Sequence, residues 1–597
     1  MASGGSQEIT PEELNVEKVY KQWERFSAWV HAICIVTFDL ELGQALEAVY
    51  PSSSKLSEED KLNICYLAFP DSNSGCMGDT QFHFRFRHIP HDNASPSSSH
   101  SRYNAAATVA MLANRNYLYG YVYFRQVKDP SLPRGYFQKS VIVLSKYPFV
   151  NLFLTICRMV APQFFDNGSL SIEAACHEID HWPVPVTGEI VSLPLLGTVL
   201  QAQIPGDISL GNASILQSIC STAVIPCVHL NNLFSCFSNC VYHIQLLWEL
   251  VLTGEPIVVM ASSPETCSQM VHALVTMIMP LMYCGEHRPY FTIHDMEFKE
   301  YTKTTQPPPP IILGVTNPFF SKTLQHWPHI IKLPEAVKSS TLQKSKIRKG
   351  VAKAFDSKSG VFTQYEPFLQ KDKAIVKKLL KGVQTNRPEE VQSALLRRHL
   401  LELTQSFMIP LERYMATLMP LHKNISPYKA APSPWPFNLE AFISSLDKSG
   451  PQLTTGIKGN WEGLYRRFFR SPNFIGWYNT RYKAMNEKLQ VLQLEALSEA
   501  DLRRWVADKQ EVEVVDMLIK IRCKLDKCKS QNVRLSDNVH RQLQRRMEEI
   551  VCTLPDDLRS VLEIKPSYLR TKRASFVLFS HNQRRCNQKY SLCKLGN

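Results

Sequence analysis

The chain has 597 residues, 44% of them hydrophobic and 20% charged, which predicts a globular protein of two to four domains and excludes the fibrous and fully disordered classes. Its net charge of +13 is uneven, because residues 1–338 carry 21 Lys/Arg and 29 Asp/Glu whereas residues 339–597 carry 46 and 25. The 16 cysteines form no CxxC pair, and several stand in apolar runs, as reduced and buried thiols do.

The first residues and the most apolar stretch bear on where the protein resides. The N-terminal sequence MASGGSQEITPEEL is polar and acidic, unlike a signal peptide. The longest apolar stretch, around residues 269–284, is interrupted by His272 and Pro280 and is too short to span a bilayer. We therefore expect a cytoplasmic protein. Its basic back half predicts peripheral contact with an anionic membrane or an acidic partner, and no nucleic-acid-reading motif accompanies it.

The first part of the chain is predicted to form an antiparallel sheet. The segment QFHFRFR alternates Phe82, Phe84 and Phe86 with polar residues, as a strand with two different faces does. Other apolar runs of strand length follow one another with short turns between them. We expect strands at 28–38, 63–69, 81–87, 118–124 and 140–145, and a helix on one face of the sheet at 149–160.

Two segments of this half lack such regular patterns. Residues 92–110 are small and polar with no core pattern, which predicts a flexible loop. Residues 182–232 contain several short strand-like runs separated by turn residues.

The stretch 241–294 is predicted to be a compact α/β unit. Apolar residues at helical spacing lead to Gly254, which ends the helix because glycine adopts the left-handed conformation without a steric penalty. The run IVVM at 257–260 is typical of a strand covered on both faces, and the serines before Pro264 cap a second helix. We expect further strands at 290–293 and 311–317.

The back half begins with a change of composition. From Lys332 to about residue 390 the chain is basic and has no convincing core face, which predicts a linker. Apolar spacing then predicts helices, one of them divided or kinked at Pro410. Ser498 and Asp501 resemble a capping box before a later helix.

The sequence contains few motifs that could carry covalent chemistry. His177–His181 formally matches HExxH, which would place two imidazoles on one helix face to bind zinc. Pro183 and Pro185 would end that helix at the second ligand, so we predict no metal site. The GxxGxxxG spacing at 456–463 is too weak to indicate nucleotide binding. Because no P-loop, GxSxG or kinase signature is present, we expect no catalytic side chain and no cofactor.

Eight stretches along the chain carry a specific pattern: FSAWVHAICIVTFDLELGQALEAVYP (26–51), NICYLAFPDSNSGCMGDTQFHFRFR (63–87), YGYVYFRQVKD (119–129), RGYFQKS (134–140), WELVLTGEPIVVMA (248–261), RPYFTIHDMEFKEYT (288–302), ILGVTNPFFSKTLQHWPHII (312–331) and ELTQSFMIPLERYMATLMP (402–420). Together these stretches resemble the DENN-domain family, and within it the subfamily called DENN domain-containing protein 6, or FAM116. Residues 92–116 and the tail after residue 566 depart from the family pattern.

The resemblance implies a fold of the α/β plus α class. The expected parts are an N-terminal longin-like module (an antiparallel sheet with helices), a central α/β DENN module and a helical C-terminal part. The implied boundaries are 1–24 for a flexible N-terminus, 25–170 for the longin-like module with a disordered loop at about 90–115, 171–333 for the central DENN module, 334–390 for the basic linker, 391–565 for the helical part and 566–597 for a disordered basic tail.

The same resemblance implies the activity of a guanine nucleotide exchange factor for a Rab GTPase. Such a protein binds the switch regions of the GDP-bound or nucleotide-free Rab, so that GDP leaves and GTP enters. The implied setting is endosomal and recycling traffic, with the protein peripheral on recycling endosomes. The unusual 92–116 segment keeps an alternative open, a Rab effector or trafficking scaffold that binds without exchanging nucleotide.

Candidate Rab contacts are the polar residues expected to be exposed on loops of the matching stretches. Trp248 is predicted to belong to the core instead. The candidates are Asp39, Glu41, Asp71, Asn73, Glu249, Glu255 and His294.

Overall fold

The chain forms two compact units. Unit 1 comprises Met1–Ala416 and Phe437–Arg481, and unit 2 comprises Thr417–Pro436 and Tyr482–Asn597. Asn73, residues 91–97 and the tail after residue 566 lie outside the described residues. The computed structural model describes residues 23–39, 41, 43–71, 77–90, 98–108, 111–132, 135–206, 224–228, 232–334, 359–447, 450–451, 457–530 and 535–563.

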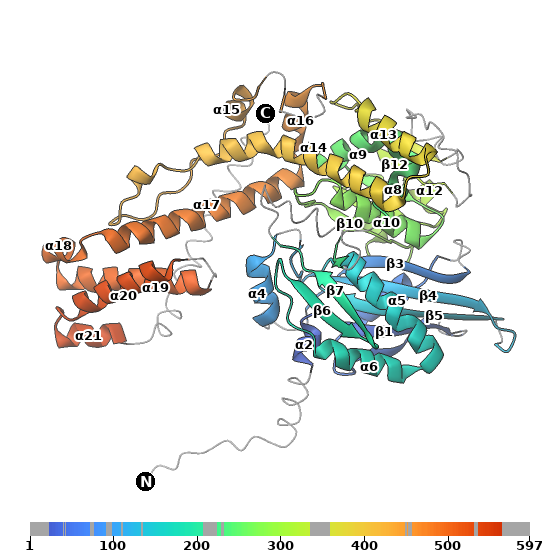
Figure 1. Cartoon of the computed structure of the whole chain (residues 1–597), viewed down its shortest axis with the longest axis horizontal. Helices are drawn as coiled ribbons and strands as arrows, with labels where there is room; N and C mark the ends of the chain where they lie inside the picture. Colours follow the sequence, from blue (N-terminus) through green and yellow to red (C-terminus); the bar gives the residue numbers. More distant parts are fainter. Residues whose placement is uncertain are drawn as a thin grey trace, which may run out of the picture. The chain divides into compact units, whose positions relative to one another are not determined.

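Unit 1 begins with a five-stranded antiparallel sheet in the order β2-β1-β5-β4-β3 (Figure 1). The strands are β1 (Ala32–Asp39), β2 (Gly43–Tyr50), β3 (Gly78–Arg87), β4 (Tyr117–Lys128) and β5 (Tyr136–Ser145), after a short helix α2 (Glu24–Ser27). The predicted antiparallel sheet is confirmed. On β3 the alternation buries Phe82, Phe84 and Phe86 in one core, while His83 and Arg85 are buried on the opposite face.

The strand predicted at 63–69 is wrong, because helix α3 (Glu58–Leu67) occupies most of it. The Ser57 hydroxyl accepts a hydrogen bond from the Asp60 amide at 3.0 Å, and the Asp60 carboxylate accepts one from the Ser57 amide at 3.1 Å. This capping box fixes the start of the helix. Ile64 and Leu67 then bury the apolar side of α3 in the core of the sheet.

The other face of the sheet is covered by α5 (Val150–Asn167), α6 (Ser169–Asp180) and a small sheet of β6 (Ile190–Leu195), β7 (Thr198–Gln203) and β8 (Ile225–Pro226). The predicted helix at 149–160 is thereby confirmed. The described residues of 171–228 share a core with α5, so they pack with the N-terminal sheet, although the central module was predicted to begin at 171.

The flexible loop predicted for 92–110 contains a helix, α4 (Ser98–Ala106). Its Tyr103 is 2% exposed, and the Tyr103 ring meets the ring of Tyr147 edge to face at 5.0 Å. The Asn104 side chain exchanges two hydrogen bonds with the backbone of Ala113, at 2.8 and 3.1 Å. Aromatic packing with residues distant in sequence therefore orders a segment whose local composition indicates a loop.

A second five-stranded sheet, in the order β10-β11-β9-β12-β13, forms the middle of unit 1. Its first four strands are parallel to their neighbours, and β13 is antiparallel to β12. The elements of this region are η2 (Ser238–His243), α8 (Leu233–Phe237), α9 (Ile244–Leu252), β9 (Ile257–Met260), α10 (Pro264–Thr276), β10 (Glu286–Arg288), α11 (Phe298–Tyr301), β11 (Ile311–Val315), α12 (Phe320–Thr323), β12 (His329–Lys332) and β13 (Gly360–Thr363).

The predicted course from α9 through β9 to α10 is confirmed. Gly254 adopts φ +69°, and the Ser263 hydroxyl accepts a hydrogen bond from the Thr266 amide at 3.3 Å at the start of α10. Trp248 is fully buried, as predicted, and its indole N–H donates to the Thr404 hydroxyl at 2.9 Å. These signals are local, so the sequence alone reveals them.

The strand predicted at 290–293 is wrong, because the chain leaves the central sheet after β10. Pro289, which has no amide hydrogen, follows the strand directly. The Tyr290 ring then enters the core of the N-terminal sheet, and its hydroxyl donates to the Phe69 carbonyl at 3.1 Å. Tyr290 thus ties the central region to the N-terminal sheet. The strand predicted at 311–317 is confirmed by β11.

The linker predicted for 334–390 is wrong in its described part, 359–390. Strand β13 extends the central sheet, with Val361 and Phe362 buried, and α13 (Lys373–Gln384) follows it. The Asp372 carboxylate caps α13 by accepting hydrogen bonds from the Ala374 and Ile375 amides, at 2.8 and 3.2 Å. Three successive residues of this short strand are buried, and the basic composition of the surrounding segment does not reveal them.

Long helices complete unit 1. Helix α14 (Glu389–Thr417) passes through Pro410 as one assigned helix, where a break or kink was predicted. The Phe407 ring of α14 stacks on Tyr465 at 4.3 Å. The remaining helices are α15 (Leu439–Ser444), α16 (Trp461–Phe468) and the first part of α17 (Pro472–Glu499).

Unit 2 is helical, as predicted for the C-terminal part. Its core brings together buried Leu494, Leu518 and Leu543. The capping box predicted at Ser498 is wrong: Ser498 lies inside α17, and the Asp501 carboxylate caps the next helix through the Arg504 amide at 3.1 Å. The elements of unit 2 are the rest of α17, η3 (His422–Asn424), α18 (Leu502–Ala507), α19 (Glu511–Ser530), α20 (Asp537–Val551) and α21 (Asp556–Glu563). Within the described parts of both units, none of the helices combines the length and apolarity needed to cross a bilayer.

Candidate functional site

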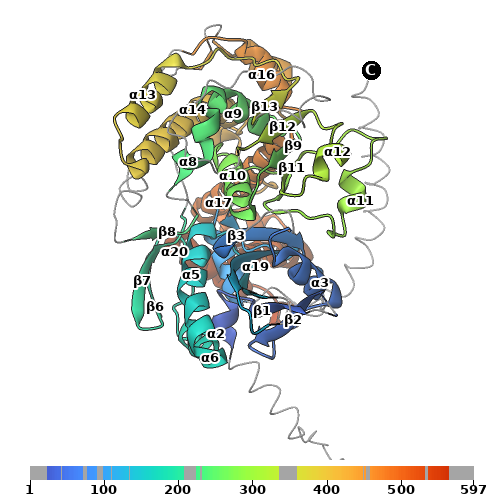
Figure 2. The ribbon, with the colours of Figure 1, turned by 90° about the vertical axis from the view of Figure 1, so that its right-hand side faces the viewer.

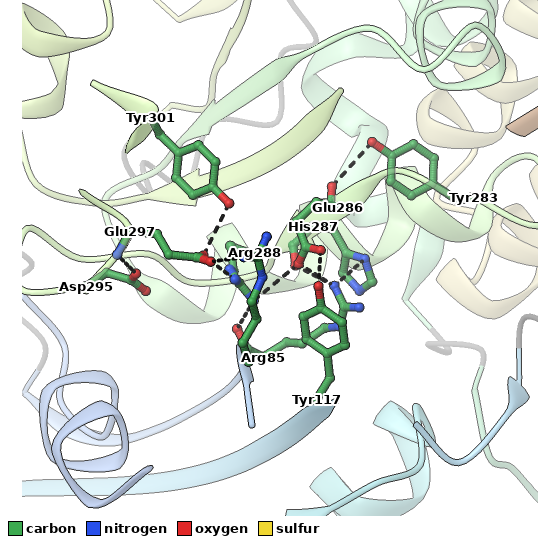
Figure 3. A network of polar contacts seen from close by, with 10 residues as sticks. Arg85, Tyr117, Tyr283, Glu286, His287, Arg288, Asp295, Glu297 and Tyr301 are labelled. Atoms are coloured by element: carbon green, nitrogen blue, oxygen red, sulfur yellow. Dashed lines mark hydrogen bonds and ion pairs between the residues drawn. The ribbon is translucent and has the colours of Figure 1, made fainter. Parts of the chain in front are cut away.

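A buried polar network joins β3 of the N-terminal sheet to β10 of the central sheet (Figure 3). The Arg85 guanidinium lies 2.8 Å from the Glu286 carboxylate and donates to the His287 carbonyl at 3.2 Å. It also sits 3.6 Å from the centre of the Tyr117 ring, and the Tyr117 hydroxyl donates to Glu286 at 2.5 Å. One cation from the first sheet is therefore held by a carboxylate from the second.

Arg288 carries the network onward from β10. Its side chain is 2% exposed and pairs with both Glu286, at 3.2 Å, and Glu297. Burial lowers the pKa of Arg288, but the carboxylates of Glu286 and Glu297 outweigh this effect and raise it. Glu297 also pairs with Arg87 of β3 at 3.0 Å and accepts a hydrogen bond from the Tyr301 hydroxyl at 3.2 Å.

The network fixes the segment 293–298. The Glu297 amide donates to the Asp295 carboxylate at 2.9 Å, and burial raises the pKa of Asp295 to about 6. Arg288 holds the Glu297 carboxylate, and the Asp295 carboxylate binds the Glu297 amide. These contacts fix the backbone around residue 296. His294 and Met296 are thereby presented outward, and both are exposed.

The same joint contains buried imidazoles. The rings of His83, on β3, and His272, on α10, lie 5.7 Å apart edge to face, and the His272 ring hydrogen-bonds the Val228 carbonyl at 2.8 Å. Burial lowers the pKa of His272 to about 4 and holds that of His83 well below its ordinary value, so both rings are neutral near pH 7. The joint thus avoids placing uncompensated positive charge beside Arg85.

An exposed surface lies next to this joint, where α3 meets the segments around 294 and 319. We call it the α3–α12 surface, and Figure 2 shows α3, α11 and α12 on the same side of unit 1. The Tyr66 ring stacks on His294 at 5.0 Å, and the Asn317 side chain donates to Asp71 at 3.1 Å. The surface comprises Leu62, Tyr66, Asp71, His294, Met296 and Phe319.

The apolar side chains of the α3–α12 surface are unusually exposed. Leu62 is 50% exposed, Met296 59% and Phe319 50%. Leu62 and Tyr66 stand four residues apart, so they share one face of α3. Exposed apolar side chains rimmed by polar ones are typical of a protein interaction site. This surface is the candidate functional site of unit 1.

Three of the predicted site residues lie at or near the α3–α12 surface. Asp71 and His294 belong to it, through their contacts with Asn317 and Tyr66. Asp39 follows Phe38, whose ring meets Phe69 just beyond α3, and the Asp39 carboxylate accepts a hydrogen bond from the Glu41 amide at 2.7 Å. Glu41 is exposed in the turn before β2, and Asn73 lies outside the described residues.

Glu249 is not a surface residue, contrary to the prediction. It lies in α9 and is fully buried. Its carboxyl group accepts hydrogen bonds from the Phe368 and Leu369 amides at 2.8 and 3.1 Å, and from the Tyr365 hydroxyl at 3.3 Å. It therefore holds the segment after β13 against α9.

Burial raises the pKa of Glu249 to about 7, although the three hydrogen bonds oppose the rise. Since the folded pKa lies above the ordinary value of 4.5, the fold favours the protonated form, and this stability is lost as pH rises through about 7. Between about pH 5 and about pH 8, Glu249→Gln should gain up to about 3 kcal/mol in unfolding free energy relative to wild type. Urea unfolding at both pH values measures this.

The matched control for that experiment is Glu255→Gln. Burial raises the pKa of Glu255, but hydrogen bonds from His329 and Arg467 outweigh burial and leave it below 4.5. Since its folded pKa lies below the ordinary value, its ionised form favours the fold, and Glu255→Gln should not gain stability relative to wild type as pH rises through the window. Parallel pH profiles for Glu249→Gln and wild type would contradict the assignment.

Glu255 is also unsuited to the predicted role of an exposed contact. Its side chain is 12% exposed and pairs with Arg467 at 2.7 Å and with His329 at 3.6 Å. These partners come from α16 and β12, so Glu255 secures the central sheet to the helices of unit 1.

The HExxH residues are used in local structure. The Glu178 carboxylate accepts a hydrogen bond from the Leu196 amide, and the His181 ring lies 2.6 Å from the His177 carbonyl. Helix α6 ends at Asp180, whose carboxylate accepts from the Phe26 amide at 2.7 Å. Among the described residues, no group of three or more His, Cys, Asp or Glu is placed to hold a metal ion.

The site predicted from the sequence contains only polar residues, so it lacks the apolar side chains of the α3–α12 surface. Leu62 and Tyr66 follow the Ser57–Asp60 capping box and are four residues apart. The capping box and this spacing predict a helix, and Leu62 is its exposed apolar residue. In the pair Phe319–Phe320, the second ring is buried and the first is half exposed. No local signal shows that these residues meet.

Comparison with known proteins places these features in a family. Residues 136–331 match the model of the DENN (AEX-3) domain, residues 502–565 that of the DENND6 C-terminal domain, and residues 30–178 that of Transport protein Avl9. Protein DENND6A of Gallus gallus and Protein DENND6B of Homo sapiens are each 50% identical over 548 residues, which is 90% of this chain and 94% of each relative. The Protein DENND6 homolog of Dictyostelium discoideum is 32% identical over 572 residues, 83% of this chain and 76% of that protein.

Identity of 50% over nine-tenths of the chain, together with matches to both the DENN and the DENND6 C-terminal models, shows that the chain belongs to the DENND6 subfamily of DENN-domain proteins.

Proposed function

We propose that this chain is a guanine nucleotide exchange factor for a Rab GTPase. DENN-domain proteins are generally Rab exchange factors, and the DENN match runs from β5 of the N-terminal sheet to β12 of the central sheet. The observation that carries the proposal is the α3–α12 surface, which presents exposed apolar side chains and is linked across by the Tyr66–His294 and Asn317–Asp71 contacts.

Exchange requires only a surface that binds the empty Rab more tightly than the loaded one. The difference in binding free energy is what lowers the affinity of the Rab for GDP. A 100-fold acceleration of GDP release corresponds to about 2.7 kcal/mol of such differential stabilisation. A few well-packed apolar contacts on a preorganised surface supply energies of this size.

We place this activity in the cytoplasm, with the protein peripheral on recycling endosomes and acting in endosomal and recycling traffic. In this proposal the N-terminal sheet is a longin-like module that shares the Rab with the central DENN module. The Rab binds in its GDP-bound or nucleotide-free form, and the basic residues of the C-terminal half assist contact with an anionic membrane.

The test is release of a fluorescent GDP analogue from a panel of purified Rabs, with and without the full chain. We expect accelerated release from one or two Rabs and no effect on the others. If every Rab responds as it does without the protein, while circular dichroism shows that the protein is folded, exchange is refuted. Selective binding of GTP-loaded Rabs in that case would assign the alternative role of an effector or scaffold.

A further inference from the structure

We propose that the loop Thr417–Pro436 of unit 2 inserts into the surface of an anionic membrane. Leu421 and Trp435 would enter the interfacial region, while Lys423 and Lys429 meet lipid headgroups. The proposal rests on the peripheral membrane location proposed above, and gives it a specific site. It does not depend on the α3–α12 surface, which belongs to unit 1.

The loop has a defined backbone that brings its two ends together. The Trp435 amide donates to the Leu418 carbonyl at 2.9 Å, so Trp435 lies next to the start of the loop. Three residues after Leu418, Leu421 begins a short turn closed by the Ile425 amide, which donates to the His422 carbonyl at 3.0 Å. Since three residues span at most about 11 Å, Leu421 and Trp435 lie at the same end of the loop.

The loop turns some apolar side chains inward and others outward. Leu418 and Ile425 are each 7% exposed, and a hydrogen bond from the Gln493 side chain of α17 to the Lys429 carbonyl anchors the loop to unit 2. Leu421 is 61% exposed and Trp435 64%. An exposed tryptophan beside an exposed leucine on an anchored backbone is costly in water and suits an apolar interface.

The residue types indicate a lipid interface. The indole ring of tryptophan is amphipathic and concentrates at the headgroup level of bilayers. Between Glu412 and Glu440 the chain contains no Asp or Glu but three Lys/Arg. Lys423 and Lys429 are both exposed, so within the loop itself the apolar residues are accompanied by positive charge only. Such a combination matches a negatively charged lipid surface.

Two other occupants fit less well. Residues 564–597 carry eight Lys/Arg and no Asp or Glu, so their charge opposes Lys423 and Lys429, whereas it would add to attraction by anionic lipid. A stable protein interface buries roughly 1,000 Å² or more, which two isolated apolar side chains do not provide. Insertion into lipid needs no such continuous patch.

The experiment is co-sedimentation of the full chain with phosphatidylcholine vesicles, alone or with about a quarter phosphatidylserine. We expect sedimentation to require phosphatidylserine. The double variant Leu421→Glu/Trp435→Glu should reduce the partition coefficient at least tenfold. Lys423→Gln/Lys429→Gln should reduce both binding and its dependence on salt between about 0.1 and 0.5 M. Leu170→Glu, at a 74% exposed leucine of unit 1, is the matched control and should bind as wild type does.

Equal binding of vesicles with and without phosphatidylserine would overturn the proposal, as would wild-type binding by the Leu421→Glu/Trp435→Glu variant. The GDP-release assay, performed without vesicles, separates this result from the exchange activity. Loss of vesicle binding with retained exchange supports the loop as a membrane site. If wild type exchanges nucleotide but binds no vesicles, the proposal that the loop inserts into a membrane is refuted and the exchange activity stands. If wild type binds vesicles but exchanges no nucleotide, only the proposed exchange activity is refuted.

Discussion

Replacing Arg288 by Met is expected to lower the free energy of unfolding by about 3–5 kcal/mol, because it removes one partner from a buried ion network. The Arg288 side chain is 2% exposed and lies between Glu286 and Glu297, which are 20% and 16% exposed. Both carboxylates would remain in place, largely buried and each with one cation fewer. Methionine restores much of the volume, so the loss reports charge rather than a cavity.

Arg87→Met is the matched control, since Arg87 pairs with the same Glu297 carboxylate at 3.0 Å but is 54% exposed. Exposed pairs contribute about 1 kcal/mol or less, so this variant should change unfolding little. Urea unfolding followed by circular dichroism gives the comparison. Equal losses for the two variants would show that burial does not set the strength of the network. Adding Glu297→Gln to Arg288→Met should recover part of the loss, because the unpaired charge is then neutral.

Sequence patterns predict those parts of this fold whose signals are local. The course through α9, β9 and α10 follows from Gly254, the serine cap and Pro264, which act on their own neighbours. The alternation of Phe82, Phe84 and Phe86 predicts a strand for the same reason. The resemblance to DENN-domain proteins adds an expected fold class for the whole chain, and the comparisons confirm the subfamily.

The wrong predictions concern residues whose state depends on distant partners. The run 63–69 reads as a strand until the capping box at Ser57 is taken into account, and α4 is ordered by Tyr147, far along the chain. Glu249 seems a surface acid in a helix, yet its partners Phe368 and Leu369 lie more than 100 residues later. The predicted site also omits the apolar residues of the α3–α12 surface, which lie on segments near 62, 296 and 319 that are far apart in the sequence.

Leu62→Glu and Met296→Glu should each reduce kcat/KM for Rab exchange by roughly 30-fold or more, which corresponds to about 2 kcal/mol of lost transition-state binding. Leu62 lies on α3, which packs on the N-terminal sheet, and Met296 lies in the central region, so the pair tests whether the partner spans both. Each side chain is at least half exposed, and a glutamate there remains solvated in the free protein. Unfolding should therefore stay within about 0.5 kcal/mol of wild type.

A bound Rab would bury either glutamate against its own surface, and the unpaired charge would then oppose association. Leu170→Glu again serves as the control, because Leu170 is 74% exposed on α6 of the same unit and lies outside the α3–α12 surface. A loss of exchange in only one of the two variants would confine the contact to one sheet. Wild-type exchange in both would show that the Rab binds elsewhere, even if exchange itself is confirmed. An equal loss in Leu170→Glu would mean that added negative charge, rather than the lost apolar contact, weakens the complex.

Because the network of Arg288 and Glu297 fixes the segment carrying Met296, Arg288→Met at a temperature where it is still folded should also slow exchange, whereas Arg87→Met should not. Arg288→Met therefore measures how much exchange depends on a rigid segment, because Arg288 is buried. Leu62→Glu and Met296→Glu measure direct contact with the Rab, because these side chains are exposed and contribute little to the fold.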